Sequence, residues 1–597
     1  MIFGVHFATM RAFMPKPTPP LSEIQTWFKN HVSLHGEPYF LDPEQATAVC
    51  DSHKNTLVTA RAGSGKTRII VAKIAYLIKR QGIKPEQISA FVFNCTAAAE
   101  INQRLTEVKI DGAPLLTEVP SIATTFHKFA LDTLKQVGQR PKIVSEDARN
   151  QLLIAIIKRH TYPQNPLKSA HILQPPTPAE AQTLSLISQF INRAQQKYPG
   201  TIGYKKLTGA ISNYSADPQT KIFYDFALPI YRDYRQALKQ QGKIDFNILM
   251  SDAAAFLARI SVIVFSRDAS ARPVVTGARR LFSAVACEKP SKTLSTLIQR
   301  LSTKRYLLID EYQDFSYLFL NLVNQLRKLC PEAHLFAVGD DWQAINRFAG
   351  SDCTYFLNFA DFFPEDAHKI NLITNYRSDR KIVDTASEYM INATGQNAAK
   401  ITAFSKKSGK IHRVNYLKIR FDTEDIKGDA LHDSAFQYAL AHEIYPPNAI
   451  NLPPTASAKL LKSTLKIIKK HRKAEQILIL HRHNFTSFPG LTMPKFYQAL
   501  KQVTIQNYIL TAEEFDQKVN WLTIHRSKGL EADVIIILEA DDKLLFNDPK
   551  NNLFEIFGDN PTTNREDQHR LYYVATTRAK HHLYLLTADS KASKKPR

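Results

Sequence analysis

The chain has 597 residues but only five cysteines, and it carries fewer acidic than basic side chains. The cysteines are widely scattered and form no CxxC pair; they are Cys50, Cys95, Cys287, Cys330 and Cys353. This spacing argues against a disulfide framework and against a zinc site, and it suits a reducing cytoplasm.

Long apolar runs are also missing. No segment approaches the ~18 apolar residues that a membrane-spanning helix needs. The first residues, MIFGVHFATMRAFMPKP, contain His6 and Arg11 within their apolar stretch and have no basic region before it, unlike a secretory signal peptide. We therefore expect a cytoplasmic protein that does not bind membranes.

Positive charge, in contrast, is abundant. The 78 Lys and Arg residues exceed the 55 Asp and Glu residues and give a formal net charge of +23. Such an excess favours a polyanionic partner, most commonly nucleic acid, although charge spread over the surface for solubility is the alternative. The length allows three or four domains, and the 44% share of hydrophobic residues is enough for ordinary globular cores.

The segment TARAGSGKT (59–67) lies between a short apolar run at 55–60 and an amphipathic run at 67–79. The first run predicts a buried strand, and the second predicts the helix that follows it. Between them, small residues let backbone N–H groups surround a polyphosphate at the positive end of the helix. Lys66 is then placed to reach the β- and γ-phosphates, and the Thr67 hydroxyl to hold Mg²⁺. The alternative is a glycine-rich turn without a ligand, and Ala60 stands where the strict pattern has glycine.

Two further polar segments follow apolar runs downstream. Asp310 and Glu311 come directly after the run YLLI. Nucleotide hydrolysis needs such a pair, because one carboxylate binds the Mg²⁺ shell and the other polarises the attacking water. We assign Asp310 to the metal and Glu311 to the water; a solvated acidic loop is the alternative. Gln343, in the segment GDDWQ (339–343), is a candidate sensor of the γ-phosphate.

Short apolar strands alternate with helical patterns twice along the chain, which is typical of parallel α/β sheets. The first set comprises 57–60, 90–93, 122–126, 306–310 and 335–339, and the second comprises 369–373, 477–481, 521–525, 534–538 and 582–586. Two such sheets predict a ligand cleft between them. The long helical stretch between the third and fourth strands predicts an inserted α-helical subdomain.

These patterns divide the chain into two α/β units, which we name lobe 1 and lobe 2, and three other parts. The predicted segments are an N-terminal extension (1–40), the ATP-binding first part of lobe 1 (41–126), a helical insertion (127–245), the second part of lobe 1 (246–368), lobe 2 (369–588) and a basic tail (589–597).

The phosphate loop, the acidic pair and the segment GDDWQ occur in this order, and with them the chain resembles the superfamily 1 DNA helicases of the UvrD/Rep type. The sequence GDDWQAI…RFAGSD is especially similar to the corresponding motif of bacterial helicase IV. Further segments match the family in order. They are LDPEQ (41–45), FVFNCTAAAEI (91–101), TTFHKF (124–129), DF (245–246), NYRS (375–378), IHRSKGLE (524–531) and YVATTRA (573–579). The resemblance extends from about 41 to 586 and implies an α/β fold with two RecA-like parallel-sheet lobes and the helical insertion in the first.

The resemblance also implies roles for individual residues. Gln45 reads the adenine edge, Tyr376 stacks on adenine, and Arg377 and Arg578 touch the γ-phosphate as arginine fingers. The implied catalytic residues are Lys66, Asp310, Glu311, Gln343, Arg377 and Arg578, with Thr67 and Asp310 on Mg²⁺. The implied ATP-binding residues are Gln45, Ala60, Arg61, Ala62, Gly63, Ser64, Gly65, Lys66, Thr67, Arg68, Tyr376 and Glu531. The implied DNA contacts are Phe126, His127, Phe348 and His525, with Trp342 as a further candidate.

Two lengths depart from the family pattern. Only roughly 35 residues separate the strand at 477–485 from the His525 segment, too few for a folded subdomain of the usual size. We therefore expect the accessory subdomain of lobe 2 to be reduced or absent, and a protein partner is a possible replacement. Conversely, the stretch 256–302 is longer than expected and indicates a basic surface insertion. Asn346 stands where relatives usually have a tyrosine beside the stacking aromatic residue.

The sequence thus predicts an ATP-dependent DNA helicase and translocase that uses ATP and Mg²⁺ and binds single-stranded and tailed duplex DNA. The resemblance implies 3′-to-5′ polarity. One alternative is a DNA-stimulated ATPase switch or translocase subunit of a repair or defence complex that does not unwind DNA by itself. An RNA helicase of the same superfamily is a second alternative. A scaffold with a dead nucleotide site is disfavoured because every expected ATP residue is present.

Overall fold

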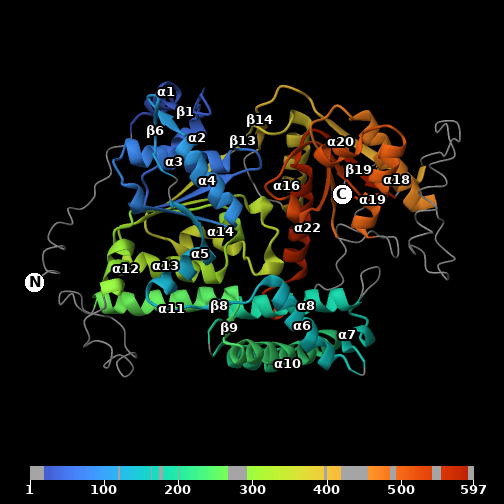
Figure 1. Ribbon diagram of the computed structural model, residues 1–597, viewed down its shortest axis with the longest axis horizontal. Coiled ribbons are helices and arrows are strands. Elements are labelled where there is room, and N and C mark those ends of the chain that lie inside the picture. The colour runs from blue at the N-terminus through green and yellow to red at the C-terminus, as the bar shows by residue number, and fades with distance from the viewer. Residues whose placement is uncertain are drawn as a thin grey trace, which may run out of the picture.

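The structure is a computed structural model, and the description covers residues 19–118, 121–162, 164–173, 179–200, 202–265, 292–394, 400–418, 455–483, 492–540 and 553–588. Two parallel sheets, each with its own helices, lie beside one another, and a bundle of helices lies below them in Figure 1. The predicted α/β fold with two parallel-sheet lobes is confirmed. Within the described residues, none of the helices is both long and apolar enough to cross a membrane.

The sheet of lobe 1 has six parallel strands. Their order is β12 (Ala367–Leu372), β3 (Asn55–Ala60), β11 (His334–Gly339), β10 (Tyr306–Ile309), β4 (Ile88–Val92) and β7 (Ala123–Thr125). Successive residues point to opposite faces of a strand, so Leu308 packs under one layer of helices and Leu307 under the other. Burial on both faces explains why these strands are apolar along their whole length.

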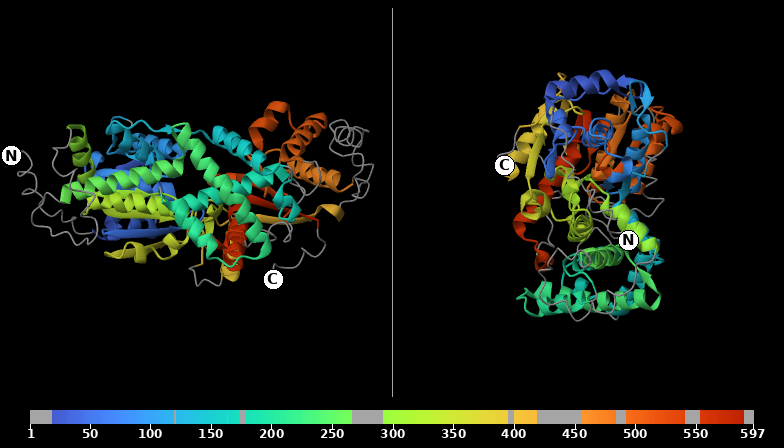
Figure 2. Two further views of the ribbon diagram at one scale, coloured as in Figure 1. Left: turned by 90° about the horizontal axis from the view of Figure 1, so that it is seen from below. Right: turned by 90° about the vertical axis from the view of Figure 1, so that its left-hand side faces the viewer.

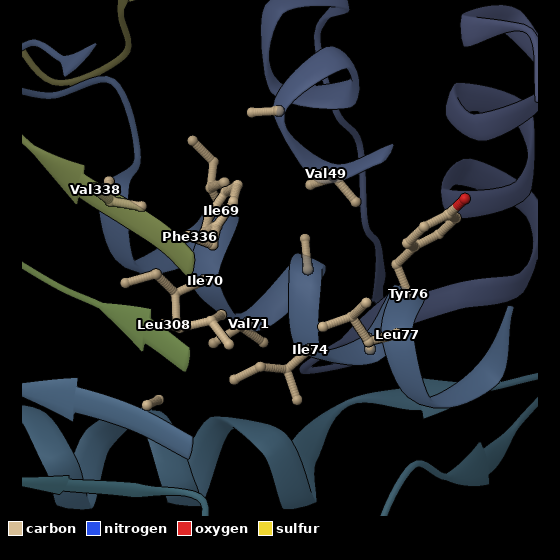
Figure 3. Packing of buried hydrophobic residues seen from close by; sticks show 14 of the residues in the cluster. Val49, Ile69, Ile70, Val71, Ile74, Tyr76, Leu77, Leu308, Phe336 and Val338 are labelled. Atoms are coloured by element: carbon tan, nitrogen blue, oxygen red, sulfur yellow. The ribbon is translucent and has the colours of Figure 1, made fainter. Parts of the chain in front are cut away.

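Helices cover both faces of this sheet. One face is covered by α2 (Pro43–Cys50), α3 (Lys66–Lys79) and α4 (Cys95–Glu107), and Figure 3 shows residues of α3 packed against Phe336 and Val338 of β11. The other face is covered by α5 (Phe126–Gln136), α11 (Phe246–Phe265) and α13 (Tyr317–Leu329). The carboxyl ends of β3, β10 and β11 consequently meet at one edge, where the predicted ATP residues follow.

One strand of the predicted second set belongs to the first sheet. The run 369–373 lies in β12, which pairs in parallel with β3 so that Ile370 is opposite Val58. Its apolar pattern fits an edge strand of either sheet, and periodicity alone does not identify the partner. The assignment of this strand to lobe 2 was therefore wrong, and the chain changes sheets only after Leu372.

The sheet of lobe 2 has five parallel strands. Their order is β15 (Lys410–Asn415), β19 (Ala579–Thr587), β18 (Ala532–Ile537), β16 (Ile477–His481) and β17 (Val519–Thr523). On one face lie α18 (Thr455–Lys470) and α19 (Met493–Gln506), and on the other lies α22 (Pro561–Thr576). The helix α16 (Arg380–Thr394) contacts α22, and the short strands β13 (Thr374–Asn375) and β14 (Thr402–Ala403) pair beside it.

The predicted helical insertion contains two kinds of helix. The first, α5, packs on the sheet of lobe 1. The others enclose a separate core; they are α6 (Glu146–His160), α7 (Pro166–Ser169), α8 (Ala179–Lys197), α9 (Gly203–Ser212) and α10 (Pro218–Gln240). In both Figure 1 and the right-hand view of Figure 2 this bundle forms the lower end of the molecule. Phe554 and Ile556, which precede α22, also enter this core.

Smaller elements complete the two lobes. The helix α1 (Leu21–His31) packs on the α2–α3 side of lobe 1, above a small sheet in the order β2 (Glu37–Pro38), β1 (Val32–Leu34), β5 (Lys109–Ile110) and β6 (Ala113–Pro114). Between β16 and β17, the described residues hold only α19 and α20 (Ala512–Lys518). In the predicted 256–302 insertion, α11 continues to Phe265 and α12 begins at Lys292, and 266–291 lie outside the described residues.

Candidate nucleotide and nucleic-acid site

The phosphate loop joins the carboxyl end of β3 to the amino end of α3. Gly63 and Gly65 have φ angles of +73° and +88°, which side chains with a Cβ atom adopt at a cost. A Cβ atom on Gly63 would lie 2.8 Å from Asn375 Nδ2. Glycine is therefore required here both for the turn and for the close approach of the segment that follows β13.

The side chains of this loop fit a polyphosphate with Mg²⁺. Lys66 Nζ lies at the mouth of the loop, 3.3 Å from the carbonyl oxygen of Ala60. Among the residues that the structure describes, the buried Ser64 Oγ finds no hydrogen-bond partner. The backbone N–H groups at the start of α3 add partial positive charge, which favours an anion. Thr67 follows directly and offers a hydroxyl oxygen, a donor type that Mg²⁺ accepts.

The segment LDPEQ lies beside this loop. Asp42 caps α2, and its carboxylate accepts a bond of 2.7 Å from the N–H of Gln45. The side chain of Gln45 donates to the carbonyl oxygen of Ser64 at 3.0 Å, so it is fixed against the phosphate loop. Tyr376 OH donates to Asp42 at 2.5 Å, with its ring 37% exposed. The two residues predicted to contact adenine thus lie on the same side of the loop.

The acidic pair follows β10. Glu311 has a left-handed backbone, with φ of +51°, and its N–H donates to Asp310 Oδ1 at 2.9 Å. Burial, together with the neighbouring Glu311, raises the pKa of Asp310 to about 7. Burial alone would raise the pKa of Glu311 too, but Lys528 and Lys66 outweigh it and lower that pKa to about 2. Glu311 is thus ionised near neutral pH, in the form that accepts a proton.

Lys528 of lobe 2 contacts this acidic segment. Its ammonium group donates to Asp314, the last residue of DEYQD, and lies 3.6 Å from Glu311 Oε2. Burial would lower the pKa of Lys528, whereas Asp314 and Glu311 raise it. Lys528 stands in the segment IHRSKGLE (524–531) and Asp314 lies just after the acidic pair, but the sequence alone predicts no role for either. Their pairing depends on the closed arrangement of the lobes, which the sequence does not show.

A second set of buried charges lies behind Gln343. Arg61 Nη1 donates to Asp340 Oδ1 and to Asp341 Oδ1, both at 2.7 Å. Gln343 Nε2 donates to Asp340 Oδ2 at 2.6 Å, which leaves its carbonyl oxygen for another donor. The guanidinium group of Arg61 lies 3.9 Å from the centre of the Trp342 ring. Arg61 is predicted to bind ATP, but in this structure its guanidinium group bonds to two aspartates and stacks on a tryptophan ring.

Arg377 approaches the phosphate loop from lobe 2. A Cβ atom on Gly63 would lie 2.9 Å from Arg377 Cβ. Arg377 Nε donates to Glu531 Oε2 at 2.6 Å, and Nη1 donates to the carbonyl oxygen of Thr577 at 3.3 Å. Glu531, predicted to bind ATP, also pairs with Lys580 at 3.2 Å. In this structure Glu531 orients the guanidinium group of Arg377.

Arg578 follows the carboxyl end of α22 and is fully buried. Its Nε donates to the carbonyl oxygen of Val574 at 2.9 Å, and its Nη2 donates to Gln343 Oε1 of lobe 1 at 3.1 Å. Burial, with Arg377 nearby, lowers the pKa of Arg578 to about 9. A buried guanidinium group beside another arginine lacks a full counter-charge, so this place favours an anion such as a phosphate.

The predicted DNA contacts fall into buried and exposed residues. Phe126 is only 2% exposed, and its ring stacks on Phe91 at 4.8 Å and on Phe319 at 4.5 Å between centroids. Trp342 is fully buried, with Arg61 over its ring and Tyr573 against its edge. Neither residue has a free ring face for a base, so both pack the protein interior in this structure.

Of the other predicted contacts, Phe348 is exposed, whereas His127 and His525 are half-buried. Phe348 is 42% exposed and meets His525 of lobe 2 edge to face at 5.2 Å. Burial, with Arg482 and Lys528 nearby, lowers the pKa of His525 to about 4, which keeps this imidazole neutral. His127 packs 4.8 Å from the exposed Phe246. Phe348 and His525 thus form an aromatic pair across the two lobes.

A buried ionic network connects Phe348 to the helical insertion. Its neighbour Arg347 pairs with Asp567 of α22 at 2.8 Å and lies 3.8 Å from Asp559. Asp559 also pairs with Arg193 of α8 at 2.6 Å. The network therefore joins the aromatic pair, the helix α22 that precedes Arg578, and the separate helical core. Sequence reasoning missed it, because no spacing along the chain links these residues.

Comparison with protein families gives two matches. Residues 41–364 match the UvrD/REP helicase N-terminal domain, and residues 457–590 match the UvrD-like helicase C-terminal domain. The first match contains the phosphate loop and the acidic pair, and the second contains Lys528 and Arg578. The two matches therefore cover both sides of the site described above.

Individual relatives agree with these family matches. The chain is 25% identical to DNA helicase IV of Escherichia coli (strain K12), over 92% of this chain and 68% of the relative. It is 26% identical to a probable DNA helicase II homolog of Mycoplasma pneumoniae, over 59% of this chain and 42% of the relative. It is 26% identical to the ATP-dependent DNA helicase PcrA of Bacillus subtilis, over 59% of this chain and 39% of the relative. The chain thus spans less than half the length of the last two relatives. The resemblance seen in the motifs is confirmed, and the chain belongs to the UvrD/REP helicase family.

Proposed function

We propose that this protein is an ATP-dependent DNA translocase and helicase that moves 3′ to 5′ along single-stranded DNA. The observation that carries the proposal is the meeting of Arg377 and Arg578, from lobe 2, with the phosphate loop and Gln343 of lobe 1. Family membership supports ATP-driven work on DNA, and the polarity rests on the motif resemblance.

Different residues of the chain have different roles in ATP hydrolysis. Bound Mg²⁺ would neutralise charge on the phosphate oxygens, and Thr67 and Asp310 are the residues to hold it. Lys66 and the loop N–H groups bind the phosphates. Glu311, whose carboxylate is ionised because Lys528 and Lys66 lower its pKa, orients and polarises the attacking water. Arg377 and Arg578 stabilise the charge that develops on the transferred phosphoryl group.

Hydrolysis then changes how strongly the lobes hold together. Both arginines reach the nucleotide only when lobe 2 lies against lobe 1, so ATP favours closure. Loss of the γ-phosphate removes the group that both lobes share, and the lobes separate. Gln343 connects this event to DNA, because it contacts Arg578 and lies close in the chain to Phe348. A cycle of closing and opening moves the aromatic pair along the strand.

The DNA contacts proposed are Phe348, His525 and His127. Bases stacked on aromatic side chains contribute ~1–3 kcal/mol each and are bound without sequence preference, which suits a motor. Phe93 is a further candidate, since it lies in the segment FVFNCTAAAEI, is 37% exposed and contacts Phe319 edge to face at 5.8 Å. The net charge of +23 supports attraction to the phosphate backbone.

Strand displacement tests the proposal directly. A short duplex with a 3′ tail is mixed with protein and ATP, and displacement and hydrolysis are recorded in the same tube. We expect displacement that requires both ATP and the 3′ tail. The matched control is Lys66→Ala, which should bring both activities to background while its thermal unfolding stays near that of the wild type. Displacement from a 5′-tailed duplex only would overturn the polarity.

A second candidate function is a DNA-stimulated ATPase that does not unwind DNA by itself. It is favoured by one observation: only α19 and α20 lie between β16 and β17 in the described residues, where the family pattern has a subdomain. Vigorous DNA-stimulated hydrolysis without displacement from either tailed duplex would support this function and a requirement for a protein partner. RNA in place of DNA in the same assay tests the RNA helicase alternative.

A further inference from the structure

A cluster of metal-ligand side chains lies away from the nucleotide site, at the amino ends of the lobe 1 strands. Asp51 Oδ1 lies 2.7 Å from His53 Nδ1 and 2.8 Å from His368 Nδ1. The two imidazole rings are 4.1 Å apart, with an angle of 37° between their planes. Two imidazole nitrogen atoms and one carboxylate oxygen thus lie within 4.8 Å of one another.

The sheet itself builds this cluster. Asp51 and His53 lie in the loop that joins α2 to β3, whereas His368 lies on β12, the neighbouring edge strand. The register of the two strands places His368 opposite Thr56, whose hydroxyl donates to the other carboxylate oxygen of Asp51. This end of the sheet is opposite to the end that carries Lys66 and Asp310, so the proposed ATPase function does not use the cluster.

We propose that Asp51, His53 and His368 bind a divalent cation of the zinc class. Imidazole nitrogen with one carboxylate oxygen is a donor set that suits Zn²⁺, Co²⁺ and Ni²⁺, whereas Mg²⁺ prefers oxygen ligands alone. The second oxygen of Asp51 is held by Thr56, which orients the carboxylate as an outer-shell partner does in metal sites. Water is the expected fourth ligand.

Binding a metal ion requires only a small movement of the ligand side chains. Ligand bonds of about 2.0–2.1 Å in a tetrahedral site place ligand atoms somewhat farther apart than the 2.7 and 2.8 Å found here. Asp51 is fixed, with its side chain only 5% exposed, but the side chains of His53 and His368 are 42% and 38% exposed and free to rotate outward. One cation, Lys73, opposes binding, since its ammonium group donates to the backbone carbonyl oxygen of Asp51.

The ion would join β12 to the loop that leads into β3. The strand β12 continues into the segment of Tyr376 and Arg377, and β3 continues into the phosphate loop. A ligand that binds only the folded chain stabilises it in proportion to the logarithm of its concentration above Kd. The ion would thus cross-link two segments at the edge of lobe 1. Bound zinc should raise the unfolding temperature of the protein without changing the chemistry of ATP hydrolysis.

Zinc binding to the metal-free full chain tests the proposal, by calorimetry and by competition with a chromophoric chelator. Wild type is expected to bind one Zn²⁺ ion, and His53→Asn and His368→Asn to bind it at least about 10-fold more weakly. Asparagine keeps a donor toward Asp51 but is a poor zinc ligand, so these variants should fold. The matched control is His31→Ala, from an exposed pair in which His31 Nδ1 lies 2.6 Å from Asp111.

Two further readouts separate the outcomes. Co²⁺ in place of Zn²⁺ should give the visible absorption of a four-coordinate site in wild type and His31→Ala, and not in the two asparagine variants. ATP hydrolysis by the zinc-free variants, assayed with Mg²⁺, should equal that of zinc-free wild type, which shows that they are folded. Equal zinc affinity in wild type and the asparagine variants would overturn the proposal, as would equal loss in the His31→Ala control.

Discussion

Arg578 Nη2 donates to Gln343 Oε1 at 3.1 Å, and this single bond links the helix that precedes the last strand of lobe 2 to the loop after β11 of lobe 1. Gln343 accepts it because its amide nitrogen already donates to Asp340. The guanidinium group has further bonds to carbonyl oxygens within lobe 2, so it stays in place when the lobes separate. The side chain of Arg578, the proposed arginine finger, is therefore held within lobe 2, and its position relative to the phosphate loop depends on closure.

Replacing Arg578 with Ala should reduce the ATPase kcat by about 10³-fold or more, since an arginine finger contributes 10³–10⁵ in comparable phosphoryl transfers. Arg578→Lys should stay strongly impaired, because an ammonium group does not reproduce the planar fork. The matched control is Arg565→Ala, an exposed residue on α22, the helix that precedes Arg578. Steady-state hydrolysis with saturating DNA measures all three. A kcat for Arg578→Ala within tenfold of wild type would contradict the assignment.

Two phenylalanines should respond in opposite ways to truncation. Phe348→Ala should weaken binding of a labelled oligothymidylate by about 10- to 100-fold, because a stacking platform is lost, and should leave urea unfolding unchanged. Phe126→Ala should lower the free energy of unfolding by about 3–5 kcal/mol, since this ring is packed between Phe91 and Phe319. Fluorescence anisotropy and urea titration distinguish the two effects. Weaker DNA binding by both variants in proportion to their stability would argue against a platform at Phe348.

These two residues also illustrate what the sequence could predict. The phosphate loop and the acidic pair were placed correctly at strand ends, because their chemistry requires particular residues at fixed local spacing. Phe126 and Phe348 stand in equally good motifs, yet one ring is buried and the other is exposed. Burial depends on which helices cover a strand, and the helix α13 that supplies Phe319 lies far along the chain. The local sequence pattern therefore identified the segments that contain Phe126 and Phe348, but it did not show which of the two rings is accessible.

The same limit explains the edge strand and the ionic network. The run 369–373 has the apolar pattern of any half-buried strand, and only pairing with β3 assigns it to lobe 1. Asp559, Arg193 and Arg347 come from three distant segments, and each alone resembles a surface charge. Their contacts arise when the segment before α22 enters the helical core through Phe554. Long-range packing thus decides features that periodicity leaves open.

The ion pair of Arg193 and Asp559 should matter for stability. Its atoms are 2.6 Å apart and each side chain is 8% exposed, so removing Arg193 leaves the buried Asp559 with the more distant Arg347, at 3.8 Å, as its counter-charge. Arg193→Ala should therefore lower the free energy of unfolding by about 3–5 kcal/mol. The control is Arg232→Ala. The Arg232 side chain is 61% exposed, so its ion pair with Asp233 contributes at most about 1 kcal/mol to stability. Urea unfolding followed by circular dichroism compares the variants, and equal midpoints would contradict the prediction.

Acid should destabilise lobe 2 through His471. Burial, with His582 and Lys470 nearby, lowers the pKa of this imidazole to about 4, whereas an unfolded histidine has a pKa near 6.5. Between these two values the unfolded chain binds a proton that the folded chain does not bind, so stability falls as pH decreases from about 6.5 toward 4. Because solvent reaches the half-buried ring and screens its charge, we expect a loss of only about 1 kcal/mol between pH 7 and pH 5.

The variant His471→Gln isolates this contribution. Glutamine keeps a polar group near Tyr584 OH, which lies 2.7 Å from His471 Nε2, but it does not titrate. Urea unfolding at pH 7 and pH 5 should therefore show a smaller loss of stability in the variant than in wild type. The control His35→Gln, at an exposed position of lobe 1, should keep the wild-type difference. If His471→Gln loses as much stability as wild type over this interval, the buried histidine is not the group that senses acid.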